Sequence, residues 1–204
     1  SRECPKVETR TCPRVFAGEF AAHDVERRST LRAAIAESAF MTGLLRNSDV
    51  VVMSSYAPLL ARADAYQWAP DLIWFDNTRV FGTPSYYVQL LYGQNRPDVV
   101  LPTEVQGDPV DLTLLPPEKV ATFGAVPLKP YAPDFIPTLY ATAGLSKANN
   151  EVVLFLANPF PQERNASIRL KGKQLGGTAT VQRIAGDDPD IVNSFEAPRA
   201  IAPR

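Results

Sequence analysis

Apolar and polar positions alternate in blocks through the first half of the chain, and each block predicts one element. Residues 15–20 (VFAGEF) are compact, aromatic and apolar with one carboxylate near the end, which predicts a short buried strand. Ser29-Thr30 offers an N-cap, and the apolar positions that follow recur at helical spacing as far as a polar stop at Asn47-Ser48. The pattern predicts a helix whose apolar face carries Leu31, Ile35, Phe40 and Leu44.

A second run of branched apolar residues, residues 49–53 (DVVVM), predicts another strand directly after this helix. Strand, helix and strand in this order form the unit of a parallel sheet. Residues 72–75 (LIWF) predict a further short strand, and residues 85–92 suit a helix that begins after Pro84. The first half is therefore predicted to be α/β.

Proline and glycine divide the chain into two halves. Residues 1–92 contain five prolines and three glycines, whereas residues 93–204 contain fourteen and eight. Because proline breaks helices and fits poorly in central strands, the second half should consist of loops and short strands. The strand candidates are residues 99–101, 110–115, 120–123, 139–143, 152–157, 166–170 and 178–184, and residues 127–137 should form an extended connector. We therefore expect an α/β domain over 1–92 and an antiparallel β-sandwich over 93–204.

Composition and charge remove several classes of function. The chain has 204 residues, 45% of them hydrophobic and 21% charged, which is typical of a globular protein. The formal net charge of −1 provides no strong field for nucleic acid or an anionic membrane, and no apolar run approaches the length of a membrane span. One histidine and two cysteines leave little for a zinc site, so we expect neither metal nor cofactor.

The cysteines and the first residue bear on compartment and processing. Cys4 and Cys12 are eight positions apart, and they fit either a disulfide in an oxidising compartment or two reduced thiols. We favour a secreted or extracellular location. The chain begins at Ser1 with neither an initiator methionine nor a signal peptide, so we expect a processed or truncated product.

Glu19 is the first candidate for chemistry, because it lies at the end of a predicted strand. In parallel α/β barrels the active site is built from the carboxyl ends of the strands, and Gly18 would let another group approach the backbone. The alternative is a surface glutamate that opens a loop, or a buried one paired with an arginine. His23 and Asp24 follow within five residues and would line the same pocket, unless they simply lie exposed in a polar loop.

A second group of candidates combines aromatic rings with polar side chains. Residues 71–77 (DLIWFDN) place carboxylates and an amide around Trp74 and Phe75, and Tyr86-Tyr87 follows soon after. Aromatic faces beside hydrogen-bonding groups suit sugar rings, but the same residues suit an ordinary core. Both interpretations stay open at this point.

Several motifs in the same order resemble α-L-arabinofuranosidases of glycoside hydrolase family 51. Residues 15–21 resemble the "VFVGEYA" signature of that family, and residues 30–44 resemble its next helix. Further matches are residues 47–51 and 55–59 to "NSDVV…ASYAPL", 68–77 to "W.PDLIYFDN", 82–89 to "GTPSYYVQ" and 193–198 to "NSFENP". The resemblance covers residues 15 to about 203 and indicates the C-terminal portion of such an enzyme.

The resemblance implies a fold and a function. The fold would comprise the last strand–helix units of a (β/α)₈ barrel followed by a jelly-roll-like antiparallel β-sandwich. Glu19 takes the place of the catalytic nucleophile, and Phe20 replaces the usual tyrosine, so that hydroxyl is absent. Asp71 falls near a position where relatives place a polar residue that contacts the sugar. The family removes terminal α-L-arabinofuranosyl groups from glycosides and polysaccharides with retention of configuration.

The second carboxylate that retention requires is missing from the expected context. A retaining glycosidase needs a nucleophile and an acid/base about 5–5.5 Å apart. The family carries its acid/base in an upstream "GNE" motif, and the one Asn-Glu pair here is Asn150-Glu151, in the sandwich half. Glu26 and Glu37 should lie on the outer side of a barrel unit. We therefore expect a fragment that requires an upstream barrel segment.

Two rival interpretations remain at the level of sequence. One is a non-catalytic, carbohydrate-binding or structural β-sandwich with a barrel remnant, and the other is a different two-carboxylate glycosidase of the same barrel type. The motifs at 82–89 and 193–195 argue against the latter. The expected partner is an arabinose-containing oligo- or polysaccharide, with no nucleic acid and no membrane, and an oligomer is possible.

Overall fold

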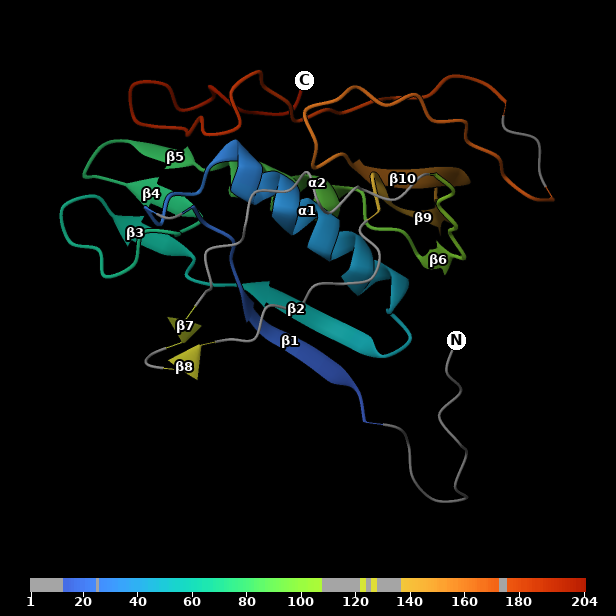
Figure 1. Cartoon of the computed structure of the whole chain (residues 1–204), viewed down its shortest axis with the longest axis horizontal. Coiled ribbons are helices and arrows are strands. Elements are labelled where there is room, and N and C mark those ends of the chain that lie inside the picture. The colour runs from blue at the N-terminus through green and yellow to red at the C-terminus, as the bar shows by residue number, and fades with distance from the viewer. Residues whose placement is uncertain (1–12, 25, 108–121, 124–125, 128–136, 173–175) are drawn as a thin grey trace.

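Helix α1 (Leu31–Arg46) lies at the centre of the fold, with small sheets of two or three strands around it (Figure 1). The structure is a computed structural model that describes residues 13–24, 26–107, 122–123, 126–127, 137–172 and 176–204. The Thr30 hydroxyl caps the helix by accepting a 3.2 Å hydrogen bond from the Ala33 amide, and Asn47 forms the C-cap. The predicted start and stop of this helix are confirmed.

Strands β1 (Val15–Phe20) and β2 (Val51–Tyr56) flank α1 in the sequence and pair in parallel. The predicted strand–helix–strand unit is therefore confirmed. The expectation that the first strand is buried is wrong, because the side chains of Val15 and Phe16 are 46% and 55% exposed. Within the described part of the chain the β1–β2 sheet has two strands, so little else covers it.

A second small sheet and helix α2 follow β2. Strands β3 (Leu60–Arg62), β4 (Ile73–Phe75) and β5 (Val80–Gly82) lie in that order, with β3 and β4 parallel and β4 and β5 antiparallel. Helix α2 (Pro84–Gln94) starts on a proline and is capped by Thr83. The strand predicted at 72–75 and the helix predicted after Pro84 are thus confirmed.

The second half supplies antiparallel strands, as its composition predicted. Strands β6 (Val99–Leu101), β9 (Tyr140–Ser146) and β10 (Glu151–Ala157) form one sheet in the order β10-β9-β6. Strands β7 (Thr122–Phe123) and β8 (Val126–Pro127) form a short antiparallel pair. Among the described residues no helix follows α2.

Two of the predicted strands do not form. Residues 166–170 and 178–184 contain no strand, and Ile168 and Val181 are 58% and 75% exposed. Their alternating pattern needs a partner strand, and neither segment has one in the described structure, although Ile184 packs against the core. The candidates at 110–115, the first half of 120–123 and most of the 127–137 connector lie outside the described residues, as do Cys4 and Cys12.

The core joins the two halves of the chain around α1. Buried Ala34, Met41, Val88 and Tyr92 form its centre, and part-buried Phe20, Leu44, Leu45, Phe155 and Ile184 pack against it. The Tyr92 ring on α2 stacks on the Phe155 ring of β10 with 4.2 Å between centroids. Packing across the proposed 92/93 boundary therefore holds α2 against the β10-β9-β6 sheet.

The C-terminal segment returns over the start of α1 (Figure 1, red). The amides of Leu31 and Arg32 donate to the carbonyls of Ile191 and Pro189 at 3.0 and 2.8 Å, which satisfies amides that a helix N-terminus leaves free. The buried Asn193 side chain donates to the Gly82 and Ile201 carbonyls and accepts from the Ile201 amide. No helix in the described residues has both the length and the apolar character to cross a membrane.

Candidate active site

Glu19 lies in a β-bulge near the carboxyl end of β1. Ala17 pairs with Ser54 and Phe20 with Tyr56, so β1 carries one extra residue between these two pairs. The Ser55 hydroxyl donates to the Gly18 carbonyl at this point. Glu19 is exposed. Bulges re-aim side chains and are frequent next to active sites, so the backbone here presents a carboxylate in a way that a regular strand would not.

Phe20, which stands where the resemblance expects a tyrosine, is part of the packing. Its ring lies 5.2 Å from the Phe40 ring and 5.8 Å from the Tyr56 ring. The Phe20 carbonyl also accepts a 3.3 Å hydrogen bond from the Ala57 amide, which ties the ends of β1 and β2 together. The aromatic cluster therefore anchors the backbone on the C-terminal side of Glu19.

Asp71 is buried just before β4, with 3% of its surface exposed. One carboxylate oxygen, Oδ2, has no hydrogen-bond partner among the described residues. Burial raises the pKa of this carboxyl group above its ordinary value. No hydrogen bond or ion pair joins Asp71 to Glu19 in the described structure, and the two candidates differ in exposure, because Glu19 faces solvent.

His23 and Asp24 serve the turn in which they lie. The Asp24 carboxylate accepts hydrogen bonds from the amides of Glu26 and Arg28 and forms a 2.7 Å ion pair with the Arg28 guanidinium. Burial acts to raise the pKa of Asp24, but the hydrogen bonds and charge of Arg28 outweigh it and lower that pKa. His23 is exposed, with Nδ1 2.8 Å from the Asp24 carbonyl. Both side chains therefore stabilise the loop after β1.

Glu37 is the residue that sequence reasoning placed wrongly. Instead of lying on an outer face, it is 2% exposed and accepts a 2.8 Å hydrogen bond from the Ala22 amide. Burial raises the pKa of this carboxyl group to about 7, although the Ala22 amide and the hydroxyls of Ser85 and Tyr56 act to lower it. The sequence does contain a signal for this burial, because Glu37 lies on the same helical face as the buried residues Ala33, Ala34 and Met41.

Tyr56 completes this buried group of polar side chains. Its hydroxyl donates a 3.0 Å hydrogen bond to the Pro70 carbonyl. Burial raises the pKa of the Tyr56 phenol, and the nearby Glu37 charge adds to the effect. Ser29 and Ser85 also face Tyr56, and within the described residues their hydroxyls make no hydrogen bond of normal geometry.

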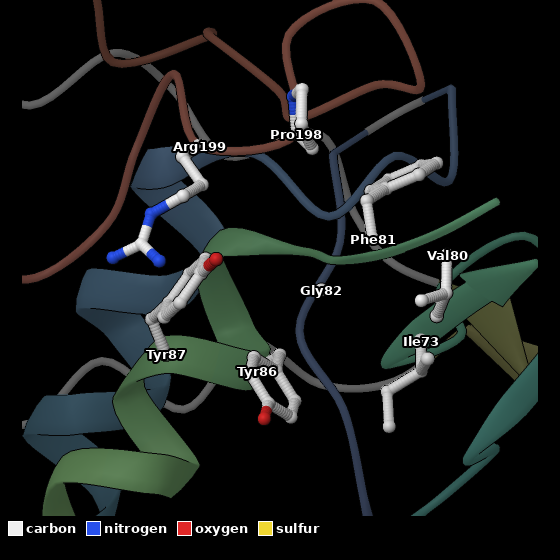
Figure 2. Close-up of a pocket in the computed structure, with 8 residues that line it drawn as sticks. All are labelled: Ile73, Val80, Phe81, Gly82, Tyr86, Tyr87, Pro198 and Arg199. Atoms are coloured by element: carbon white, nitrogen blue, oxygen red, sulfur yellow. The ribbon is translucent and has the colours of Figure 1, made fainter.

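A hollow of about 420 Å³ opens between β5, the first turn of α2 and the C-terminal segment (Figure 2). Its lining is mostly apolar and aromatic: Ile73, Val80, Phe81, Gly82, Tyr86, Tyr87, Pro198 and Arg199. The Arg199 guanidinium lies 6.0 Å from the centre of the Tyr87 ring, and a side chain at Gly82 would collide with the Tyr86 ring. Neither Glu19 nor Asp71 lines this hollow, so it is separate from both candidates.

Two other acids near Glu19 in the sequence have partners of their own in the described structure. Asp24 is held by Arg28, and Glu37 faces inward toward Ala22. The described residues also contain no cluster of three histidine, cysteine or acidic side chains that could hold a metal ion. The site as described therefore offers one exposed carboxylate on a bulged strand.

Comparison with known proteins assigns this arrangement to a family. The α-L-arabinofuranosidase C-terminal domain model matches residues 9–204. The chain is similar to the extracellular exo-α-L-arabinofuranosidase of Streptomyces chartreusis, with 44% identity over 97 residues that cover 48% of this chain and 11% of that protein. It is also similar to α-L-arabinofuranosidase A of Aspergillus niger, with 32% identity over 181 residues that cover 88% of this chain and 24% of the relative.

A solved structure supports the same fold. The family 51 α-L-arabinofuranosidase of Thermotoga petrophila RKU-1 aligns with a TM-score of 0.71 at 20% identity, covering 94% of this chain and 38% of that one. The chain thus spans only a minor part of each of these relatives. The family model covers nearly the whole chain, and the structure consists mostly of short strands with two helices. The chain therefore belongs to the α-L-arabinofuranosidase C-terminal domain family.

Proposed function

We propose that this chain is the C-terminal portion of a retaining α-L-arabinofuranosidase and that Glu19 is the catalytic nucleophile. The substrate class is a terminal, non-reducing α-L-arabinofuranosyl group on an arabinose-containing glycoside or polysaccharide. The observation that carries the proposal is the exposed Glu19 carboxylate in a β-bulge at the carboxyl end of a parallel strand, within the segment that matches the family.

The two halves have different roles in this proposal. Residues 1–92 supply the last strand–helix units of a (β/α)₈ barrel, and residues 93–204 supply a jelly-roll-like β-sandwich. The parallel pairing of β1 and β2 across α1 supports the barrel assignment. Phe16, Val52 and Met53 on these strands are 55%, 48% and 59% exposed, which fits a surface that an upstream barrel segment covers.

The chemistry follows the two-step retaining mechanism. A Glu19 oxygen attacks the anomeric carbon as the bond to the leaving oxygen breaks, and the acid/base residue gives that oxygen its proton. The product of this step is an arabinofuranosyl ester of Glu19. The same acid/base then removes a proton from water, which attacks the anomeric carbon and releases Glu19 as a carboxylate.

The acid/base comes from an upstream segment in this proposal. The mechanism needs a second carboxyl group about 5–5.5 Å from the nucleophile. Asp24 accepts a hydrogen bond from the Arg28 amide and Glu37 accepts one from the Ala22 amide, so both acids already have partners. Both curated relatives described above are about four or more times longer than the segment that matches this chain, which leaves room for an upstream acid/base residue.

Asp71 is assigned to substrate binding. Its unpaired Oδ2 atom leaves this carboxyl group free to form a hydrogen bond with a sugar hydroxyl. Its burial requires that the segment before β4 open toward the sugar when the barrel is complete.

The test uses the full-length protein with Glu19→Ala. Hydrolysis of 4-nitrophenyl α-L-arabinofuranoside should be abolished, because no carboxylate remains to form the ester, and azide should restore part of the turnover as an external nucleophile. An activated 2-fluoro arabinofuranoside should label the wild-type peptide that contains Glu19. Glu151→Ala, at an exposed glutamate on β10, is the control and should keep full activity. Wild-type activity in Glu19→Ala would end the assignment.

A further inference from the structure

The buried Glu37 side chain touches the loop that follows the candidate nucleophile. Its Oε1 atom accepts the Ala22 amide hydrogen at 2.8 Å, three residues after Glu19. Glu37 projects from the second turn of α1, a well-capped helix that packs in the core. The hydrogen bond therefore fastens the loop that follows Glu19 to a helix that is packed in the core.

On its other side Glu37 meets the segment that carries Asp71. The Tyr56 hydroxyl lies near enough to Glu37 to influence its pKa, and it donates to the Pro70 carbonyl at 3.0 Å. Pro70 directly precedes Asp71. Tyr56 is therefore a neighbour of Glu37 that is hydrogen-bonded to the segment before Asp71, whereas the direct hydrogen bond of Glu37 is the one to the loop after Glu19.

A carboxyl group is a costly choice for this position if it only fills space. Burying an ionisable group without full hydrogen bonding is unfavourable, whereas a leucine of similar size would pack against Ala34 and Met41 on the same face. Oε2 makes no direct hydrogen bond of normal geometry within the described residues. This cost indicates that the Oε1 atom is needed as a hydrogen-bond acceptor and that the side chain does more than fill space.

We infer that Glu37 is a positioning residue, which holds the Ala22 loop and thereby the direction of Glu19. The inference rests on the proposed function. Catalytic groups must be held within a few tenths of an ångström of the productive geometry, and a displacement of about 1 Å can cost about a hundredfold in rate.

The test compares Glu37→Gln with Glu37→Leu in the full-length enzyme. Glutamine keeps a carbonyl oxygen for the Ala22 amide, and leucine fills a similar volume without an acceptor. Glu37→Leu should lower kcat by about ten- to a hundredfold with KM within about twofold, and Glu37→Gln should stay within about threefold of wild type. Glu37→Met, which also lacks an acceptor for the Ala22 amide and has a more adaptable side chain, provides a second variant if Glu37→Leu does not fold.

Hydrogen exchange at the Ala22 amide provides a readout that does not depend on turnover. The amide should exchange at least about ten times faster in Glu37→Leu and at the wild-type rate in Glu37→Gln, since only leucine removes its acceptor. Glu151→Leu is the control and should change neither exchange nor kcat.

The two proposals fail in different ways. An inactive wild-type enzyme with the expected exchange pattern at Ala22 would overturn the arabinofuranosidase assignment and leave the contact of Glu37 with this loop intact. Unchanged kcat and unchanged Ala22 exchange in Glu37→Leu, or in Glu37→Met if leucine prevents folding, would overturn the positioning role. An equal loss of kcat in Glu37→Gln and Glu37→Leu would overturn it as well.

Discussion

At the scale of single residues, the burial of two acids is the main chemical feature of this chain. Glu37 and Asp71 are 2% and 3% exposed, and burial raises the pKa of both. Glu19 differs from them because it is exposed on a bulge. Exposure suits a group that must reach a substrate, whereas Glu37 lies inside the fold, where it accepts a hydrogen bond from the loop that follows Glu19.

Stability should fall as pH rises through the range set by Glu37. Its folded-state pKa of about 7 exceeds the ordinary value of 4.5, so the folded protein binds this proton more tightly than the unfolded chain. The contribution is fully present below pH 4.5 and is lost between pH 4.5 and about 7; it is on the order of 3 kcal/mol. Thermal melting of the full-length protein at pH 5 and pH 8 checks this.

The matched control for this prediction is Glu37→Gln, which cannot titrate. The difference in melting temperature between pH 5 and pH 8 should be smaller in the variant than in wild type. Equal pH dependence in the two proteins would show that Glu37 titrates normally in the folded state.

At the scale of elements, α1 organises the structure. Its first turn is held by the Thr30 cap and by the carbonyls of Pro189 and Ile191, its middle carries Glu37, and its apolar face forms the core with α2 and β10. Strands β1 and β2 flank α1 in the sequence, and their parallel pairing sets the position of the bulge that carries Glu19. Helix α1 therefore connects the segment that carries Glu19 to the core of the protein.

Removing the helix cap should destabilise the protein without touching the site. In Thr30→Ala the Ala33 amide loses the hydroxyl that accepts its 3.2 Å hydrogen bond, and Thr30 is fully buried. The expected loss is about 1 kcal/mol, measured by urea unfolding followed by tryptophan fluorescence. Thr30→Ser keeps the hydroxyl and should lose less than the alanine variant. Equal losses would assign the effect to packing of the methyl group instead of the cap.

At the scale of the whole molecule, the chain presents an uncovered parallel strand pair beside a well-packed core. Exposed apolar residues gather on the β1–β2 sheet, and unpaired strand edges favour association. The core, by contrast, draws on both halves of the chain. The molecule therefore has the means to stay folded, together with a surface that favours a covering partner.

The 204-residue chain by itself should not hydrolyse arabinofuranosides. In the proposed mechanism the acid/base residue comes from an upstream segment, so without that segment the chain should lack the proton donor for the leaving group and should associate or be poorly soluble. Purified chain assayed on 4-nitrophenyl α-L-arabinofuranoside, with its mass in solution measured by light scattering, tests both parts. Turnover that disappears with Glu19→Ala would show that residues of this chain complete the site.

Much of the local structure could be predicted from the sequence. The caps of α1, the helix after Pro84 and the antiparallel character of the second half follow from hydrogen-bonding and backbone preferences that act over a few residues. The strands expected at 166–170 and 178–184 failed because a strand needs a partner, and alternation within one segment says nothing about whether a partner exists.

In the candidate site, too, some features follow from the local sequence and others arise only from packing. Glu19 was found from its place at the end of an apolar run, and the parallel pairing of β1 with β2 followed from the order of elements. Its bulge, its exposure, the burial of Asp71 and the inward direction of Glu37 arose only in the tertiary structure. Local patterns determine which residues form a helix or a strand, because those preferences are local. Which faces become buried, and which polar atoms meet there, depends on contacts between segments far apart in the sequence, and only the packed fold decides them.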